Sequence, residues 1–161
     1  NMFKKLLSSL DAISPAPIAN AHCDGPCGVY DPASARITAE AVKSMIGKIN
    51  AMKSNAPEHT DIERYVHWHQ HLIRYTNIKE EQAEQCKKDV LILWTDAFNA
   101  ADLVTWPNLH TLFWETAKLC SSCKQDSNPA DAEALLNNIR TISDMYWQKK
   151  GRDVEWYLAK P

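Results

Sequence analysis

The residues of this sequence best suited to chemistry lie at positions 22–30, which read His-Cys-Asp-Gly-Pro-Cys-Gly-Val-Tyr. Cys23 and Cys27 are four residues apart, and the turn-forming residues between them let the chain double back. Both thiolates can therefore reach one metal ion, with a backbone nitrogen and the His22 imidazole in the same loop. Sulfur and nitrogen donors in a tetragonal arrangement suit Ni(II) or Cu(II), whereas a tetrahedral set suits zinc. Residues 22–30, the hook, are thus predicted to bind a metal ion.

Other possible ligands are weaker candidates. A zinc site would normally need two more ligands from a distant pair, and Cys120 and Cys123 are the pair that the sequence offers. Their place on a helix face favours buried thiols instead, and the same interpretation applies to Cys86. His67 and His71, four residues apart, could hold a metal, with His69 on the opposite side of the helix. Exposed histidines on a polar helix are the simpler interpretation.

Helices are expected to position the hook. Asp31 is a suitable N-cap and Pro32 a suitable first-turn residue for a helix that ends at Asn55-Ala56-Pro57. Val42 and Ile46 widen its apolar stripe. The stripe itself has helical spacing and comprises Ile37, Ala41, Met45, Ile49 and Met52.

Three further helices follow. The second starts near Thr60 or Asp61, where Thr60 and Glu63 would form a capping box, and runs to about Asn99. Its very polar stretch at residues 79–85 indicates either a kink or break there or a face covered by another subunit. After a loop at residues 100–105, the third starts at Trp106-Pro107 and carries Leu109, Leu112, Phe113, Thr116, Leu119 and Cys120 inside. The fourth stops at Gly151 and has Leu135, Leu136, Ile139, Ile142 and Tyr146 as its stripe. The pattern predicts an all-α protein, an antiparallel up-down four-helix bundle with an N-terminal metal-binding hook.

Composition narrows the classes of partner and compartment. The chain has 161 residues, a net charge of −2 and a pI near 6.3, so neither nucleic acid nor an anionic membrane is indicated as a partner. No apolar run approaches the roughly 20 residues that span a bilayer. Five cysteines, an odd number, argue against a secreted disulfide framework and favour the cytoplasm. The apolar stretch near the N-terminus, residues 6–10, is short for a secretory signal, although export by this segment stays open.

The motif His-Cys-x-x-Pro-Cys-x-x-Tyr at residues 22–30, followed by Asp-Pro-Ala-x-Ala-Arg, resembles the N-terminus of mature nickel-containing superoxide dismutases. Weaker matches lie at residues 78–80, 93–98 and 107–110. The resemblance implies a precursor that a maturation protease cuts between Ala21 and His22. Residues 1–21 would then be a pro-segment, with Asn1 reading as a leftover of cloning, and residues 22–161 the enzyme domain.

The family also implies a cofactor and a reaction. One nickel ion per mature chain would be held by His22, Cys23 and Cys27, while Tyr30 would gate the access of small anions. The implied reaction is the disproportionation of superoxide to oxygen and hydrogen peroxide at a Ni(II)/Ni(III) centre in a homohexamer. Because the His22 nitrogen is an ordinary amide while Ala21 remains attached, the uncut chain would be an inactive precursor.

The sequence departs from the family pattern around the metal. A glutamate and an arginine that steer the hook histidine in well-known members are replaced by Thr38 and Gln82, and a second tyrosine by Ala97. Residues that orient a ligand tune its metal, so the imidazole must be held differently here. Glu40, Glu81 and Gln82 are the candidates for that role.

Two other functions use the same features. A nickel or copper carrier would use the hook without turnover, and a structural bundle would keep it as a vestige. Tyr30 and a cleavable bond before His22 favour the enzyme, since a carrier needs neither a gate for anions nor the His22 imidazole that the resemblance implies as an axial ligand of Ni(III).

Overall fold

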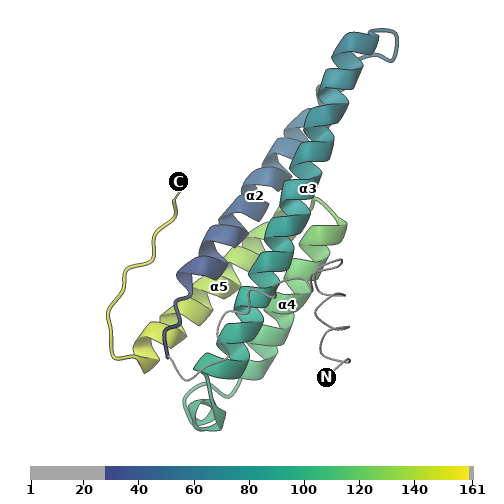
Figure 1. Ribbon diagram of the computed structural model, residues 1–161. Helices are drawn as coiled ribbons and strands as arrows, with labels where there is room; N and C mark the ends of the chain where they lie inside the picture. The colour runs from purple at the N-terminus through teal and green to yellow at the C-terminus, as the bar shows by residue number, and fades with distance from the viewer. Residues whose placement is uncertain (1–27, 160–161) are drawn as a thin grey trace, which may run out of the picture.

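The protein is built from helices, as a computed structural model shows for residues 28–159, the part of the chain that the structure describes (Figure 1). Its long helices are α2 (Ala33–Lys53), α3 (Ile62–Ile92), α4 (Leu109–Gln125) and α5 (Pro129–Lys149). Between α3 and α4 lie a π-helical turn, η1 (Leu93–Ala97), and a 3-10 helix, η2 (Ala100–Val104). The described residues contain no strand, which confirms the predicted all-α class.

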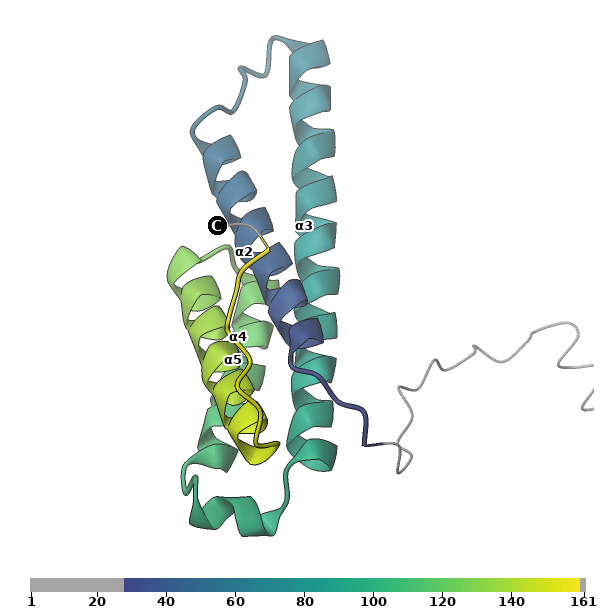
Figure 2. The same ribbon diagram turned by 90° about the vertical axis from the view of Figure 1, so that its left-hand side faces the viewer.

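The four long helices form the predicted bundle. α2 packs against α3 and α5, α4 packs against the same two helices, and successive helices run in opposite directions (Figures 1 and 2). The helices are unequal in reach, because α2 and α3 extend well beyond α4 and α5 in Figure 2. Asn50 Nδ2 donates to Ser127 O at 2.9 Å, so contact with the α4–α5 connection reaches this level of α2. Residues 51–78, which form the extension, are the α2–α3 tip.

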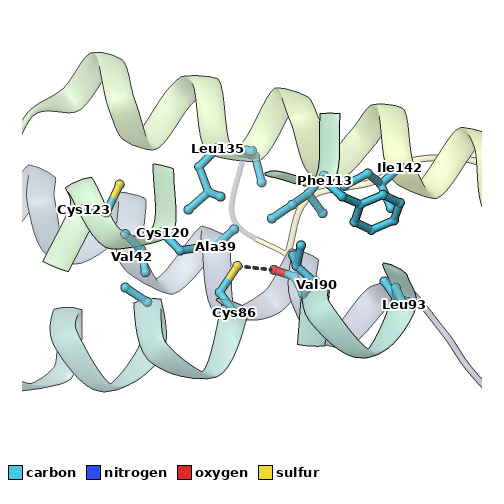
Figure 3. Close-up of a cluster of buried hydrophobic side chains, with 14 of the residues drawn as sticks. Ala39, Val42, Cys86, Val90, Leu93, Phe113, Cys120, Cys123, Leu135 and Ile142 are labelled. Carbon is cyan, nitrogen blue, oxygen red and sulfur yellow. Dashed lines mark hydrogen bonds between the residues drawn. The ribbon is translucent and has the colours of Figure 1, made fainter. Parts of the chain in front are cut away.

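Apolar side chains from all four helices meet inside the bundle (Figure 3). Phe113 of α4 and Leu135 of α5 are fully buried, and each contributes about 1.5–3 kcal/mol through removal of its side chain from water. The predicted stripe of α5 is confirmed, since all five of its members are buried: Leu135, Leu136, Ile139, Ile142 and Tyr146. Of the predicted inner face of α4, Leu112 and Leu119 are only half-buried.

The predicted stripe of α2 is partly wrong. Ile37 is 53% exposed, whereas Arg36 beside it is only 4% exposed. Arg36 is buried because its guanidinium donates to Glu40 Oε1 at 2.6 Å and lies 4.2 Å from the ring centre of Tyr157. Because of these contacts, the inner face of α2 is rotated from the predicted one. Its buried apolar residues are Ala35, Ala39, Val42, Ile46 and Ile49.

The start of α3 corrects a second expectation. Asp61 is the N-cap, and its Oδ1 accepts from Arg64 N at 3.1 Å. The capping box predicted between Thr60 and Glu63 is therefore wrong, and Thr60 Oγ1 instead lies 3.5 Å from a Glu58 carboxylate oxygen. The aspartate takes the cap because it is the residue directly before the first helical position.

The course of α3 also differs from the expectation. The helix passes through residues 79–85 without a break and ends at Ile92, where the π-helical turn η1 takes over. It stays continuous because Ala83 and Cys86 face the core, while polar neighbours such as Glu80 and Gln85 face solvent. The turn η1 brings the Trp94 ring parallel to Phe113 of α4, with 5.9 Å between ring centres.

Two helix boundaries after α3 also differ from the predicted ones. The predicted loop at residues 100–105 is mostly the 3-10 helix η2, which Asn99 and Asp102 close with a reciprocal capping box. α4 begins at Leu109 rather than at Trp106, because a turn in which Leu109 N donates to Trp106 O precedes the helix.

A buried lysine links α3 to the end of α4. Lys79 is 3% exposed, and its Nζ donates to Lys124 O and Asp126 O at 2.9 Å each. These carbonyls belong to a helix C-terminus, where unpaired oxygens carry partial negative charge. Burial lowers the pKa of Lys79 below its ordinary value, although Glu80 opposes the shift. The ammonium group therefore acts as a cap that comes from another helix.

The segment after α5 returns along the bundle (Figures 1 and 2). Gly151, with a φ of 64°, makes the left-handed turn that ends the helix, as predicted. Trp156 then packs against the core, and Ala159 N donates to Glu40 Oε2 at 2.8 Å. The C-terminal tail thus docks on its own bundle. Among the described residues, no helix has the length and apolar character needed to cross a membrane.

Candidate metal centre

The structure describes the chain from the last three hook residues onward. His22, Cys23 and Cys27, the predicted ligands, lie outside the described residues, as do Ala21 and the predicted cleavage point. Gly28, Val29 and Tyr30 are described, and they lead directly into α2. Gly28 has a φ of 65°, a left-handed conformation that glycine adopts without strain. The path of the chain just after the second thiol therefore depends on glycine.

Tyr30 is fixed to the bundle through its backbone. The hydroxyl of Tyr146, a core residue of α5, donates to Tyr30 O at 2.6 Å. Burial and the nearby Asp31 carboxylate raise the pKa of Tyr146, so its hydroxyl remains protonated and able to donate. The side chain of Tyr30 is half-buried and packs against the core. The predicted gate residue thus has an anchored backbone three positions after Cys27.

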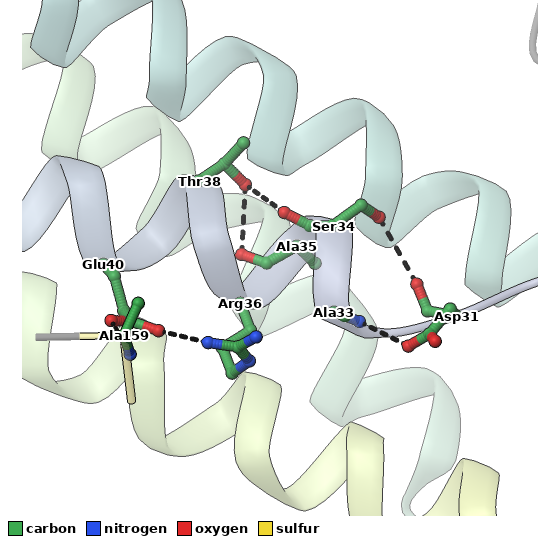
Figure 4. A network of polar contacts seen from close by, with 8 residues as sticks. All are labelled: Asp31, Ala33, Ser34, Ala35, Arg36, Thr38, Glu40 and Ala159. Carbon is green, nitrogen blue, oxygen red and sulfur yellow. Dashed lines mark hydrogen bonds and ion pairs between the residues drawn. The ribbon is translucent and has the colours of Figure 1, made fainter. Parts of the chain in front are cut away.

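The first turn of α2 is closed by its own side chains (Figure 4). Asp31 Oδ1 accepts from Ala33 N at 2.8 Å, and Ser34 Oγ donates to Asp31 O at 3.4 Å. Pro32 is buried and its carbonyl accepts from Arg36 N at 3.1 Å. This local bonding holds the start of α2, and hence the point where the hook joins the bundle.

A small cavity lies beside Tyr30, between the first turn of α2 and the last turns of α3. Its volume is about 20 Å³, enough for one water molecule. Asp89 of α3 forms part of its wall and accepts from Gln85 Nε2 at 2.8 Å. The remaining walls come from Tyr30, Asp31, Ser34, Ile92 and Leu93.

The positions that depart from the family pattern lie in the body of the bundle. Thr38 is buried, and its hydroxyl bonds to Ser34 O and Ala35 O of its own helix at 3.0 Å each (Figure 4). Cys86 Sγ donates to Ala35 O at 3.6 Å, which sets the register of the antiparallel pair α2–α3. Gln82, one turn before Cys86, therefore lies at the level of Thr38. Ala97 is buried, and its carbonyl accepts from Lys149 Nζ at 2.8 Å.

The three candidates for orienting the His22 imidazole differ in their surroundings. Glu40 is engaged by Arg36 and by Ala159 N (Figure 4). Glu81 is exposed and lines a shallow hollow on the outer side of α3. Gln82 is half-buried at the α2–α3 contact, and it stays the candidate whose level matches Thr38.

The three described thiols are core residues. Cys86, Cys120 and Cys123 are free and buried, as the sequence analysis favoured (Figure 3). Hydrogen bonding to Cys86 and burial raise the pKa of Cys120, and burial, together with Asp131, raises the pKa of Cys123 to about 11. Cys120 and Cys123 therefore stay neutral thiols, the form in which sulfur is a poor metal ligand. Within residues 28–159, no three or more His, Cys, Asp or Glu side chains gather as a metal site would require.

Tyr146 is the residue near the hook that sequence reasoning missed. Its place in the α5 stripe identified it as a core residue, and that pattern carries no signal for the direction of its hydroxyl. Only the tertiary contact between residues 116 positions apart reveals that it bonds the segment after the hook.

The fold of the described residues is that of a helical-bundle protein, and residues 28–30, which directly follow the possible metal ligands in sequence, lead into α2. The sequence model of the family described as nickel-containing superoxide dismutase matches residues 17–150. Two curated relatives named superoxide dismutase [Ni], from Streptomyces seoulensis and Streptomyces coelicolor, are each 39% identical over 145 residues, or 90% of this chain and 98% of theirs.

Solved structures of nickel-containing superoxide dismutases are similar to this chain as well. A crystal structure of nickel-containing superoxide dismutase after partial X-ray-induced reduction has a TM-score of 0.67 at 39% identity. A native nickel superoxide dismutase has 0.66 at 38%, and each comparison covers 81% of this chain and 99% of the other. The chain belongs to the nickel-containing superoxide dismutase family. Membership confirms the resemblance, the enzyme class and nickel as the metal.

Proposed function

We propose that this superoxide dismutase binds its nickel ion through His22, Cys23 and Cys27, and that the site forms only after cleavage between Ala21 and His22. The match of the family over residues 17–150, which include both hook and bundle, carries the functional conclusion. The donor set fits the metal. Thiolates, the amine and imidazole of His22 and the amide nitrogen of Cys23 are sulfur and nitrogen donors that suit nickel and stabilise its higher charge.

When bound, the nickel ion supplies one-electron exchange between Ni(II) and Ni(III), which disproportionates superoxide to oxygen and hydrogen peroxide. The protein residues bind and position this centre. Cleavage converts the His22 amide into an amine that can donate, so residues 1–21 act as a pro-segment and residues 22–161 as the enzyme domain.

Tyr30 is proposed to control which small anions reach the metal. Its backbone is tied to α5 through Tyr146, and Gly28 sets the turn that precedes it. Both features support a fixed position for the tyrosine beside the hook. Held in that position, the phenol ring would limit the access of anions to the metal.

A homohexamer is the proposed assembly. Large apolar side chains that are about half or more exposed support an interface between copies: Ile37, Ile62, Val66, Ile73, Val104 and Trp114. Native mass spectrometry of the mature chain is expected to give six chains. A monomer at micromolar concentration would contradict this assembly.

A maturation protease and a cytoplasmic location complete the proposal. Three free, buried thiols support a reducing compartment. Cell fractionation that finds the mature chain outside the cytoplasm would overturn the location without affecting the chemistry.

The decisive experiment is coexpression with a processing protease and nickel, followed by intact mass, metal content and superoxide removal. A mature mass beginning at His22, one nickel per chain and activity that is abolished by Cys23→Ser or Cys27→Ser are expected. The matched control is Cys123→Ala, which removes a buried thiol and should keep nickel and activity. Normal activity in both serine variants contradicts the ligand assignment. Nickel binding without turnover would identify a carrier, and turnover in protein that retains Ala21 would refute the precursor.

A further inference from the structure

Two histidines on the α2–α3 tip lie together in a way that suits a metal ion. His67 and His71 are one turn apart on α3, and their Nε2 atoms are 3.2 Å apart. A first-row metal lies about 2.0–2.1 Å from an imidazole nitrogen, so two such ligands at an angle of about 90–110° are about 2.9–3.4 Å apart. The observed separation falls inside that range. The two Nε2 atoms face each other within hydrogen-bond distance, so both nitrogens lie close enough to share one ion once neither carries a proton.

The two rings are in edge contact, with 4.5 Å between ring centres and 62° between planes, and their surroundings leave room for an ion beside them. His67 and His71 line an open hollow of about 320 Å³ beside the α2–α3 turn, together with Met52, Asn55, Pro57, Arg64, Trp68 and Tyr75. The hollow is accessible to solvent, so water can complete a coordination shell of which the protein supplies two ligands. Arg64 contributes a positive charge to its wall, which weakens cation binding and keeps the affinity modest.

The backbone that carries the pair is held in place. Trp68, between the two histidines in sequence, donates from Nε1 to Met52 O at 3.3 Å and so fastens α3 to the end of α2. The His71 ring also lies 5.9 Å from that of Tyr75 on the same helix. Histidines four residues apart on a regular helix form a two-armed chelate without any change in backbone.

We propose that His67 and His71 form a second metal site, separate from the hook, that takes a late first-row divalent ion such as Ni(II), Cu(II) or Zn(II). Imidazole is a suitable ligand for all three ions. The site consists of residues of the α2–α3 tip alone. It therefore depends neither on cleavage before His22 nor on the thiols of the hook.

The test is a Ni(II) titration of the full chain, free of any affinity tag, by isothermal calorimetry. Cys23→Ser and Cys27→Ser are introduced together to remove the thiol donors of the hook. One bound nickel ion is expected. Adding His67→Ala or His71→Ala should weaken binding on the order of a hundredfold, because the second arm of a chelate is lost. His69→Ala, on the opposite side of the same helix, is the matched control and should leave the affinity unchanged.

A spectroscopic measurement guards against a variant that fails to fold. In the chain with both histidines intact, Ni(II) should broaden the ring NMR signals of His67 and His71 before those of His59, His69 and His110. Absence of binding in the serine background, equal losses in all three alanine variants, or broadening that spares the pair would each overturn the site. The mature chain is purified with one nickel ion in the hook, and the tip site of modest affinity fills only when Ni(II) is added in excess. Under excess Ni(II), His67→Ala should reduce the bound nickel from two ions to one with superoxide removal unchanged. Failure of the hook as a catalyst would instead appear as lost activity with the His67–His71 ion still bound.

Discussion

The body of the bundle and the α2–α3 tip use the same helices in different ways. α3 has no buried residue before Lys79, whereas Lys79, Ala83, Cys86 and Val90 are all buried. In the body, α3 faces two neighbouring helices and its inner side chains are removed from water. In the tip it faces only the end of α2, and Ile62, Val66 and Ile73 are about half or more exposed. Stability is therefore concentrated in the body, and the tip is free to present ligands or a contact surface.

The largest expected effect is in the body. Phe113 is fully buried and contacts the rings of Trp94 and Phe98. Phe113→Ala should lower the free energy of unfolding by about 3–5 kcal/mol, since it removes a buried aromatic ring and leaves a cavity. Urea denaturation followed by circular dichroism measures the change. A loss below about 1 kcal/mol would mean that stability is not concentrated in the body of the bundle.

An intermediate effect is expected for the ion pair between η2 and α5. Lys149 Nζ donates to Asp102 Oδ2 at 2.6 Å, and Asp102 Oδ2 also accepts from Asn99 N at 2.7 Å. Burial acts to raise the pKa of Asp102, but the Lys149 hydrogen bond and the bond from Asn99 outweigh it and hold the pKa below its usual value. Asp102→Asn should cost about 1–2 kcal/mol at pH 7.

The stability difference between the original chain and Asp102→Asn should depend on pH. A carboxylate with a depressed pKa contributes stability above its unfolded pKa and loses it as the pH falls through the folded pKa. The difference between the original chain and Asp102→Asn should therefore be constant near neutrality and shrink below about pH 4. A difference that grows on acidification, measured by urea denaturation at several pH values, would contradict the role given to the ion pair.

The sequence predicted the apolar core of the body better than the polar contacts between its elements. All five residues that helical spacing predicted for the α5 stripe are buried, and Ala132, Ser143 and Met145, which it did not include, are buried as well. It misplaced Ile37 because Arg36 is buried by Glu40 and by Tyr157, which lies far along the chain. The same limit applies to the continuity of α3, since Lys79 is accepted in the core by carbonyls of another helix. The ligands of the hook stay a prediction from residue types and spacing, whereas the hydrogen bond from the Tyr146 hydroxyl to Tyr30 O depends on the fold.

The smallest expected effect is in the tip. Asp61→Ala removes the N-cap of α3 and should cost about 0.5–1 kcal/mol. Because no residue of the first half of α3 is buried, the loss should appear mainly as faster amide hydrogen exchange in the first turns, with little change in the urea midpoint. A fall in global stability as large as that of Asp102→Asn would show that tip and body unfold as one unit.

The Lys79 contact also bears on the order in which the helices form. Its partners, Lys124 O and Asp126 O, lie 45 and 47 positions further along the chain. The final carbonyls of α4 gain this charged donor only once α3 has docked beside them. The amides in the last turn of α4 should therefore become protected from hydrogen exchange at the same time as the α3–α4 contact forms. During synthesis, the hydrogen bonds of Lys79 can form only after residue 126 has been added and has packed on the bundle.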